Sequence, residues 1–315
     1  MSRARSVNAT FKATQTITFG ALDNKTYGDA PFDLSANGGA SGNPVTFALG
    51  AGSKGCSLSG TNNKTVTITA ANALGEKCII VASQAGNANY NAATDETRDF
   101  TIAKASLTVT ANNQTKILGA SDPSFTFTYS SFVNNENSGV IDTPPTCGVS
   151  VTHTDVGSYP IVCSGGADSN YSITYVNGTL NILYSFSGYL QPINDTAHQP
   201  VTGVLESKFK LGQTIPVKFN IYNSASIAVQ QATNPTFTKV SHGACDTQTA
   251  LEAPTTETPN PGAQFVWTTD HYQYNWSTKG LSAGEYRIHA NLADGTGQQN
   301  TDPLKQNYTD ICLTK

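Results

Sequence analysis

The chain has 315 residues, of which 38% are hydrophobic and 13% charged, and its formal net charge is −4 with a pI near 5.7. This length predicts two or three domains, and the apolar share separates the chain from the highly charged compositions of disordered tails. A weakly acidic chain offers no positive field for nucleic acid or anionic lipid, so we expect no nucleic-acid partner. The longest apolar run, CIIVA at residues 78–82, is too short to cross a bilayer, so we expect no membrane insertion.

Alternation of apolar and polar residues predicts strands along most of the chain. TVTIT at residues 65–69 shows it first, followed by SLTVT at 106–110 and SFTFTY at 124–129. Gly, Pro, Asn and Asp residues separate these runs, as turns between strands require. The helix-like residues 70–75 are too few to form a stable helix. This pattern predicts an all-β fold of tandem immunoglobulin-like β-sandwich modules.

Six cysteines fall along the chain as local pairs, which are Cys56 with Cys78, Cys147 with Cys163, and Cys245 with Cys312. Six cysteines allow 15 pairings, so the connectivity is a hypothesis. Cys147 and Cys163 are equally distant from Asp155 in a predicted hairpin turn, which would place them on facing strands. Buried free thiols are the alternative. An even count in an extracellular type of chain favours disulfides, each worth about 3–4 kcal/mol.

Internal repetition suggests the domain boundaries. Residues 1–14 form an N-terminal extension, and we expect modules at 15–104, 105–183 and 184–315, called here the first, second and third segments. The first and second segments each end with an Asn-Tyr pair, at residues 89–90 and 170–171, before a last alternating strand. They are joined by AKA at residues 103–105, which is too short for a flexible linker.

Motifs in the first segment carry a family resemblance. QTITF at residues 15–19, KTYGD at 25–29 and GNANY at 86–90 resemble the Ig-like repeats of bacterial surface proteins. In the second segment, ASDP at 120–123, VGSY at 156–159 and SNY at 169–171 resemble the MBG repeat of adhesin-like proteins. The usual Tyr-Gly of that repeat is replaced by Leu118 and Gly119.

The third segment is similar to a different family. IPVKF at residues 215–219 and WSTKGL at 276–281 resemble the PxKF domain, which is appended to secreted bacterial enzymes and surface proteins. Together the three resemblances imply stalk or spacer roles outside the cell and bring no catalytic residue.

No motif in the sequence predicts catalysis, a cofactor or a metal site. GAGSKG at residues 50–55 fits the dinucleotide fingerprint, but a strand and turn follow it instead of the helix that the chemistry needs. The five histidines are scattered, and His153 is expected to make a local contact in the hairpin. No Gly-x-Ser-x-Gly elbow or Cys-x-x-Cys pair occurs. We therefore expect no enzyme activity.

One aromatic row is a candidate ligand platform. Tyr272, Tyr274 and Trp276 alternate, so in a strand all three face one side, where they would stack on sugar rings or form the core. We favour the core, because PxKF-like domains place Trp at this position. Lys218 is expected on the solvated face of its strand, which disfavours a Lys–Asn isopeptide crosslink.

These observations predict a non-enzymatic, extracellular or cell-surface spacer from an adhesin-like bacterial protein. No signal peptide is visible, so we expect the sequence to be an excised piece of a secreted protein. One alternative is a carbohydrate-binding accessory module of a secreted hydrolase. Another is a subunit of a surface filament in which residues 6–11 are donated as a strand to a neighbour. Candidate partners are therefore a surface glycan, a surface protein or a second copy of the chain.

Overall fold

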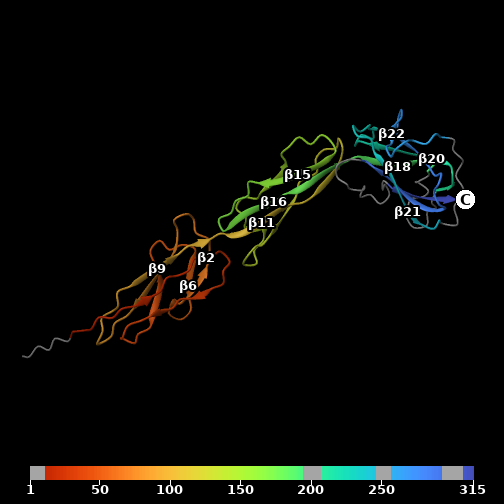
Figure 1. The fold of residues 1–315 in the computed structure, drawn as a ribbon. Coiled ribbons are helices and arrows are strands. Elements are labelled where there is room, and N and C mark those ends of the chain that lie inside the picture. The colour runs from red at the N-terminus through yellow and green to blue at the C-terminus, as the bar shows by residue number, and fades with distance from the viewer. Residues whose placement is uncertain (1–10, 194–206, 246–256, 293–307) are drawn as a thin grey trace, which may run out of the picture. The chain divides into compact units, whose positions relative to one another are not determined.

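The computed structural model describes residues 11–193, 207–245, 257–292 and 308–315. Over these residues the chain forms strands and two 3₁₀ turns, η1 (Thr61–Asn63) and η2 (Ser138–Val140), so the all-β prediction is confirmed (Figure 1). Within this described part, no helix is long and apolar enough to cross a membrane.

The chain divides into two compact units. One contains Met1–Ala111, Phe127–Cys147 and Cys163–Val176, and the other contains Asn112–Thr126, Gly148–Val162 and Asn177–Lys315. The second segment contributes to both units, so the division into three modules stays a prediction.

The first segment is a small sandwich in the first unit. Its main sheets are β3-β7-β6 and β5-β8-β9, accompanied by the short pairs β1-β4 and β10-β2. Val66, Ile80 and Phe100 fill the space between the main sheets and are almost completely buried. The strands are β1 (Thr18–Phe19), β2 (Lys25–Thr26), β3 (Phe32–Asp33), β4 (Ala36–Asn37), β5 (Val45–Leu49), β6 (Cys56–Ser59), β7 (Thr65–Ile68), β8 (Cys78–Gln84), β9 (Glu96–Phe100) and β10 (Ile102–Ala103).

The first unit also holds a three-stranded sheet from the second segment. Its order is β13 (Phe127–Ser130), β11 (Ala105–Ala111) and β16 (Tyr171–Val176), with β11 antiparallel to β13 and parallel to β16. The predicted strand at 124–129 begins only at Phe127. The reason is that β11 ends at Ala111, and the chain then enters another sheet, which leaves Phe125 without a ladder partner.

The other sheet of the second segment is four-stranded. Its order is β12 (Gln114–Ile117), β17 (Gly178–Leu183), β15 (Gly157–Ser164) and β14 (Thr146–Val149). β12 runs parallel to β17, and β15 runs antiparallel to it.

The third segment is a sandwich of two four-stranded sheets, β18-β20-β23-β22 and β19-β25-β24-β21. One aromatic core lies between them, where the rings of Phe219 and Phe265 have centroids 4.8 Å apart. The strands are β18 (Ser185–Leu190), β19 (Ser207–Lys210), β20 (Thr214–Tyr222), β21 (Thr236–Gly243), β22 (Val266–Trp267), β23 (Tyr272–Ser277), β24 (Gly284–Asn291) and β25 (Tyr308–Thr314).

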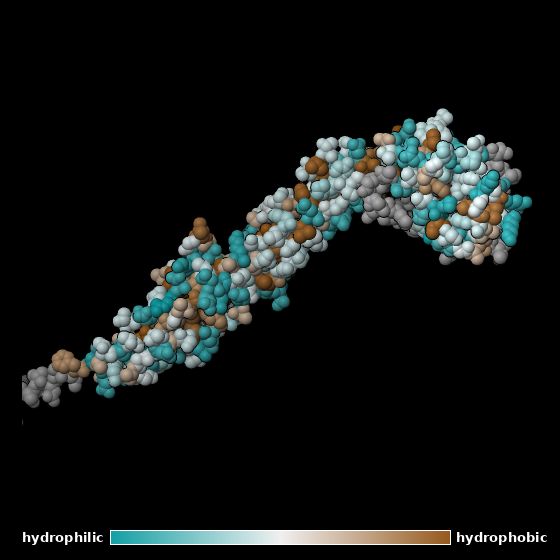
Figure 2. Space-filling view, viewed as in Figure 1, coloured by the Kyte–Doolittle hydropathy of each residue, from teal (hydrophilic) through white to brown (hydrophobic). Residues whose placement is uncertain are grey.

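Hydrophobic residues are scattered singly over the face drawn in Figure 2. The most exposed large hydrophobic side chains, Leu74 and Phe11, come from separate parts of the chain. Scattered apolar residues of this kind are normal on protein surfaces and mark no interface.

Candidate functional site

The first and second segments are joined in the first unit by a shared hydrophobic core. One cluster of buried side chains runs from Ile102 in β10 through Ala105 and Leu107 in β11 to Tyr171 in β16. The backbone N–H of Ala105 donates to the carbonyl oxygen of Asn170 at 2.9 Å. Because strand residues lie on both sides of Lys104, this connection is part of the sheets and cannot act as a free linker.

The Glu136 carboxylate holds two tyrosines that come from different segments. It accepts a hydrogen bond from the Tyr27 hydroxyl at 2.7 Å and another from the Tyr171 hydroxyl at 2.6 Å. The two rings meet edge to face, with centroids 5.7 Å apart. Burial first, and the nearby carboxylate second, raise the pKa of Tyr171 to about 12. Its hydroxyl therefore remains a protonated donor at physiological pH.

Gly28 lets the two segments approach closely beside this contact. Its φ is +94°, and a Cβ atom at this position would lie 2.6 Å from the Cβ of Val133. Only glycine combines this backbone conformation with the required space. The sequence pair Tyr27-Gly28 thus supplies both the polar anchor and the close packing of the junction.

A turn of the same design precedes the tyrosine in both segments. Asn87 Oδ1 accepts from the backbone N–H groups two and three residues downstream, at 2.8 and 3.0 Å. Asp168 Oδ1 makes the equivalent pair of hydrogen bonds, at 2.7 and 2.8 Å. The incoming chain is bound to both turns, because Ala13 N–H donates to the Asn89 carbonyl at 2.8 Å just as Ala105 does at Asn170. In the second segment the Asn170 side chain also accepts from the backbone N–H of Ala71 at 2.9 Å.

A related contact occurs in the second unit. Leu118, which stands where the MBG pattern has Tyr, packs with Val156 against the core of the third segment. Its carbonyl oxygen accepts a hydrogen bond from the backbone N–H of Ser224 at 2.8 Å. Replacing Tyr by Leu at this position is consistent with an apolar neighbour instead of a carboxylate.

The structure joins the cysteines in the three predicted pairs. Cys56–Cys78 connects β6 of one sheet to β8 of the other, so it links two sheets rather than strands of one sheet. Cys147–Cys163 joins the neighbouring strands β14 and β15. Cys245–Cys312 ties the segment after β21 to the C-terminal strand β25, with the two cysteines 67 positions apart in sequence.

The aromatic row is a core feature, which corrects its candidacy as a ligand platform. Tyr272, Tyr274 and Trp276 do face one side of β23, but their exposed fractions are only 0%, 8% and 2%. Phe237 stacks on Tyr274 with centroids 4.5 Å apart, and it also contacts Trp276. The rings are enclosed by the opposite sheet and have no face open to a sugar.

The structure also bears on the predictions made for Lys218 and for residues 6–11. Lys218 lies on the side of β20 opposite the buried Val217 and Phe219, as predicted from the alternation. Residues 6–10 of the proposed donated strand lie outside the described residues, and the Phe11 side chain is 94% exposed.

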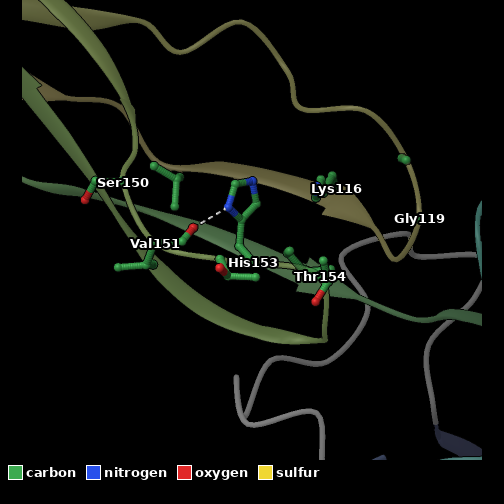
Figure 3. Close-up of a pocket in the computed structure, with 10 residues that line it drawn as sticks. Lys116, Gly119, Ser150, Val151, His153 and Thr154 are labelled. Carbon is green, nitrogen blue, oxygen red and sulfur yellow. Dashed lines mark hydrogen bonds between the residues drawn. The ribbon is translucent and has the colours of Figure 1, made fainter.

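A pocket of about 510 Å³ lies in the second unit between the hairpin tip after β14 and the loop after β12 (Figure 3). Protonated His153 donates a hydrogen bond from each ring nitrogen, from Nδ1 to the Val151 carbonyl at 2.7 Å and from Nε2 to Asp122 Oδ2 at 2.9 Å. Lys116 donates to Asp122 Oδ1 at 2.7 Å. Asp122 therefore pairs with both basic groups and clamps the hairpin tip to the loop. The contact of His153 was predicted within the hairpin, whereas its carboxylate partner, Asp122, comes from the loop after β12 and was not predicted.

This cluster predicts a pH-dependent contribution to stability. The Val151 carbonyl and then Asp122 raise the pKa of His153 above 6.5, while Lys116 and then His153 lower the pKa of Asp122 below 3.8. Protonated His153 adds stability that is complete below pH 6.5 and is lost as the pH rises through its raised pKa. Ionised Asp122 adds stability that is complete above pH 3.8 and is lost as the pH falls through its lowered pKa. The contribution is thus largest between these two values.

An NMR titration of the His153 ring checks this prediction. We expect a pKa above 6.5 in the wild type and a lower one in Asp122→Asn. The exposed Asp95→Asn serves as the matched control and is expected to leave the His153 pKa unchanged. Equal values in the wild type and Asp122→Asn would contradict the role given to Asp122.

Comparison with known families identifies part of the chain. Residues 107–181 match the MBG domain (YGX type). The match lies inside the second segment and confirms the MBG resemblance there, whereas the resemblances of the first and third segments stay predictions. The comparison with curated proteins found no match.

Solved structures similar to this chain contain immunoglobulin or surface-protein domains. Sidekick-1 immunoglobulin domains 1–5 have 11% identity and a TM-score of 0.26, with 97% of this chain and 60% of that chain covered. The Escherichia coli adhesin FdeC has 11% identity and a TM-score of 0.24, with 99% and 100% covered. Domains 4–9 of the surface layer protein SbsC have 12% identity and a TM-score of 0.21, with 95% and 47% covered. Scores this low support no conclusion about function.

Proposed function

We propose that this chain is a non-enzymatic spacer in a bacterial cell-surface or secreted protein, where it holds a functional part at a distance. The observation that carries the proposal is the construction of the junctions. The first and second segments share one core, and Leu118 of the second segment packs against the core of the third. A spacer needs joints that resist bending, and packed joints of this kind provide that resistance.

The disulfides support an extracellular location for this spacer. Such bonds persist in oxidising compartments and are rare in the cytosol. Each one closes a loop within a segment, so it limits how far the chain extends when the surrounding strands separate. The MBG match at residues 107–181 is consistent with this role. For the third segment, likeness to a PxKF domain remains part of the proposal.

The alternatives receive less support from the described residues. The aromatic row offers no surface for a glycan, since its rings are buried. For the donated strand, Ala13 is already bound within the chain, where Asn91 N–H donates to its carbonyl at 2.9 Å, while the strand itself, residues 6–11, is described only at Phe11. The spacer is therefore the function that we favour.

Single-molecule force measurements on the whole chain test the proposal. The chain is pulled from both ends, first oxidised and then reduced. The oxidised chain is expected to unfold in discrete events. The residues enclosed by each disulfide cannot extend, so they should add nothing to the extension measured in those events. Cysteine separations of 22, 16 and 67 residues predict that reduction adds about 75, 55 and 230 Å of extended chain, at roughly 3.4 Å per residue.

The paired variant Cys147→Ser/Cys163→Ser is the matched control. Oxidised, it is expected to release only the shortest of the three extra lengths. Smooth extension of the oxidised wild type at low force, without discrete unfolding events, would contradict the proposal.

A further inference from the structure

Three potential metal ligands converge on the solvent face of sheet β19-β25-β24-β21. They are His242 from β21, Glu285 from β24 and Asp310 from β25, and one ligand atom from each lies within 4.8 Å of the others. His242 Nδ1 is 3.5 Å from Glu285 Oε2. These residues belong neither to the junctions between segments nor to the pocket at His153 described above.

The strand register explains why these side chains meet. Asp310 pairs with Arg287, so Glu285 lies two residues along β24 on the same outward face. β21 has a bulge between Ser241 and Gly243, and Gly243 rather than His242 stands opposite Glu285. A bulge inserts an extra residue and re-aims its side chain, which here turns His242 toward the carboxylate.

Gly243 leaves room for this arrangement. Its φ is +152°, and a Cβ atom at this position would lie 3.3 Å from Glu285 Oε2. A residue with a side chain would therefore press on the carboxylate in a backbone conformation that such residues rarely adopt.

Arg287 orients one of the candidate ligands. Its Nε and Nη2 donate to the two oxygens of Asp310 at 2.8 and 2.7 Å. The guanidinium also lies over the ring of Tyr308, at 4.4 Å from the centroid. Ionised carboxylate oxygens keep further lone pairs after accepting such bonds, and hydrogen bonds to ligating carboxylates are a common feature of metal sites.

The third disulfide anchors the same corner of the sheet. Cys312 is the cross-strand partner of Glu285 and follows Asp310 by two residues in β25. Cys245 follows His242 by three residues and is bonded to Cys312. The bridge therefore ties the segment after β21 to β25, the two strands on either side of β24, near the point where the candidate ligands meet.

We propose that His242, Glu285 and Asp310 bind a first-row divalent transition ion of the Zn²⁺ type. One imidazole nitrogen and two carboxylate oxygens form a mixed donor set that suits such an ion. Ligand atoms about 2.1 Å from a tetrahedral Zn²⁺ lie about 3.4 Å apart, close to the observed separation of His242 from Glu285. Ca²⁺ requires six to eight oxygen ligands and is a poor fit. The bound ion would link the ends of β21, β24 and β25, with water in the fourth position.

Calorimetric titration of the oxidised, tag-free chain with Zn²⁺ tests the site. We expect saturable binding of one equivalent and no comparable binding of Ca²⁺. His242→Ala and Glu285→Gln are each expected to weaken Zn²⁺ binding at least tenfold. His271→Ala is the matched control, because His271 also lies beside an acidic residue, Asp270, but belongs to no such cluster among the described residues. The Zn²⁺ affinity of this variant should equal that of the wild type.

Two further readouts separate loss of the site from loss of the fold. Melting curves in chelator should coincide for the wild type and His242→Ala, while Zn²⁺ should raise the melting temperature of the wild type alone. The NMR signals of the His242 ring should shift on addition of one equivalent. Equal Zn²⁺ affinity in the wild type and His242→Ala, or binding of Ca²⁺ in preference to Zn²⁺, overturns the assignment.

Discussion

Replacing Cys245 and Cys312 together by serine is expected to lower the free energy of unfolding of the third segment by about 4 kcal/mol. The bond joins residues 67 positions apart, and the stabilisation from restricting the unfolded chain grows with loop length. Urea unfolding in oxidising buffer measures the change.

The matched control is the double replacement of Cys147 and Cys163, whose loop is the shortest of the three. Its expected cost is about 3 kcal/mol, because 16 positions separate the two cysteines. A larger loss in this variant than in Cys245→Ser/Cys312→Ser would contradict the ranking by loop length. A loss in neither would mean that the bonds contribute nothing to stability.

Trp276→Ala is expected to destabilise the third segment by about 3–5 kcal/mol, which is typical for deleting a large buried aromatic side chain. The ring is 2% exposed and packs between Phe237 and Tyr286, with centroids at 5.6 and 6.0 Å. Its removal leaves a cavity that the surrounding β strands are too constrained to fill. Thermal or urea unfolding gives the measurement.

Trp276→Phe keeps an aromatic ring in the same place and is expected to cost much less. The indole N–H that it removes has no hydrogen-bond partner among the described residues. A polysaccharide pull-down of both variants separates the two roles considered for this row. Unchanged stability of Trp276→Ala together with loss of polysaccharide binding would restore the platform interpretation.

Local patterns in the sequence predicted the strands well where one face is buried. β11 alternates buried Ala105, Leu107 and Val109 with more exposed residues, as the run at 106–110 predicted. β20 does the same around Lys218. Alternation indicates which face of a strand is buried but not which strand lies beside it. It therefore could not predict that β11 pairs in parallel with β16, or β12 with β17.

The disulfide pairs could be predicted from the sequence because each cysteine is bonded to its nearest cysteine in the same segment. The polar contacts could not be predicted, since they join distant positions. Glu136 bonds Tyr27 across 109 positions, and Asp122 bonds His153 across 31. The cluster at His242 depends on a bulge, and a single extra residue in one strand leaves no recognisable mark in the hydrophobic pattern.

The turns at Asn87 and Asp168 determine which substitutions the incoming strand can accept. The incoming strand is bound at each turn through backbone groups, with Ala13 N–H at the Asn89 carbonyl and Ala105 N–H at the Asn170 carbonyl. Backbone groups are the same in every residue except proline, so substitutions in the incoming strand leave this bond intact. The side chains of the incoming strand can therefore differ between the first and second segments while the point of attachment stays the same.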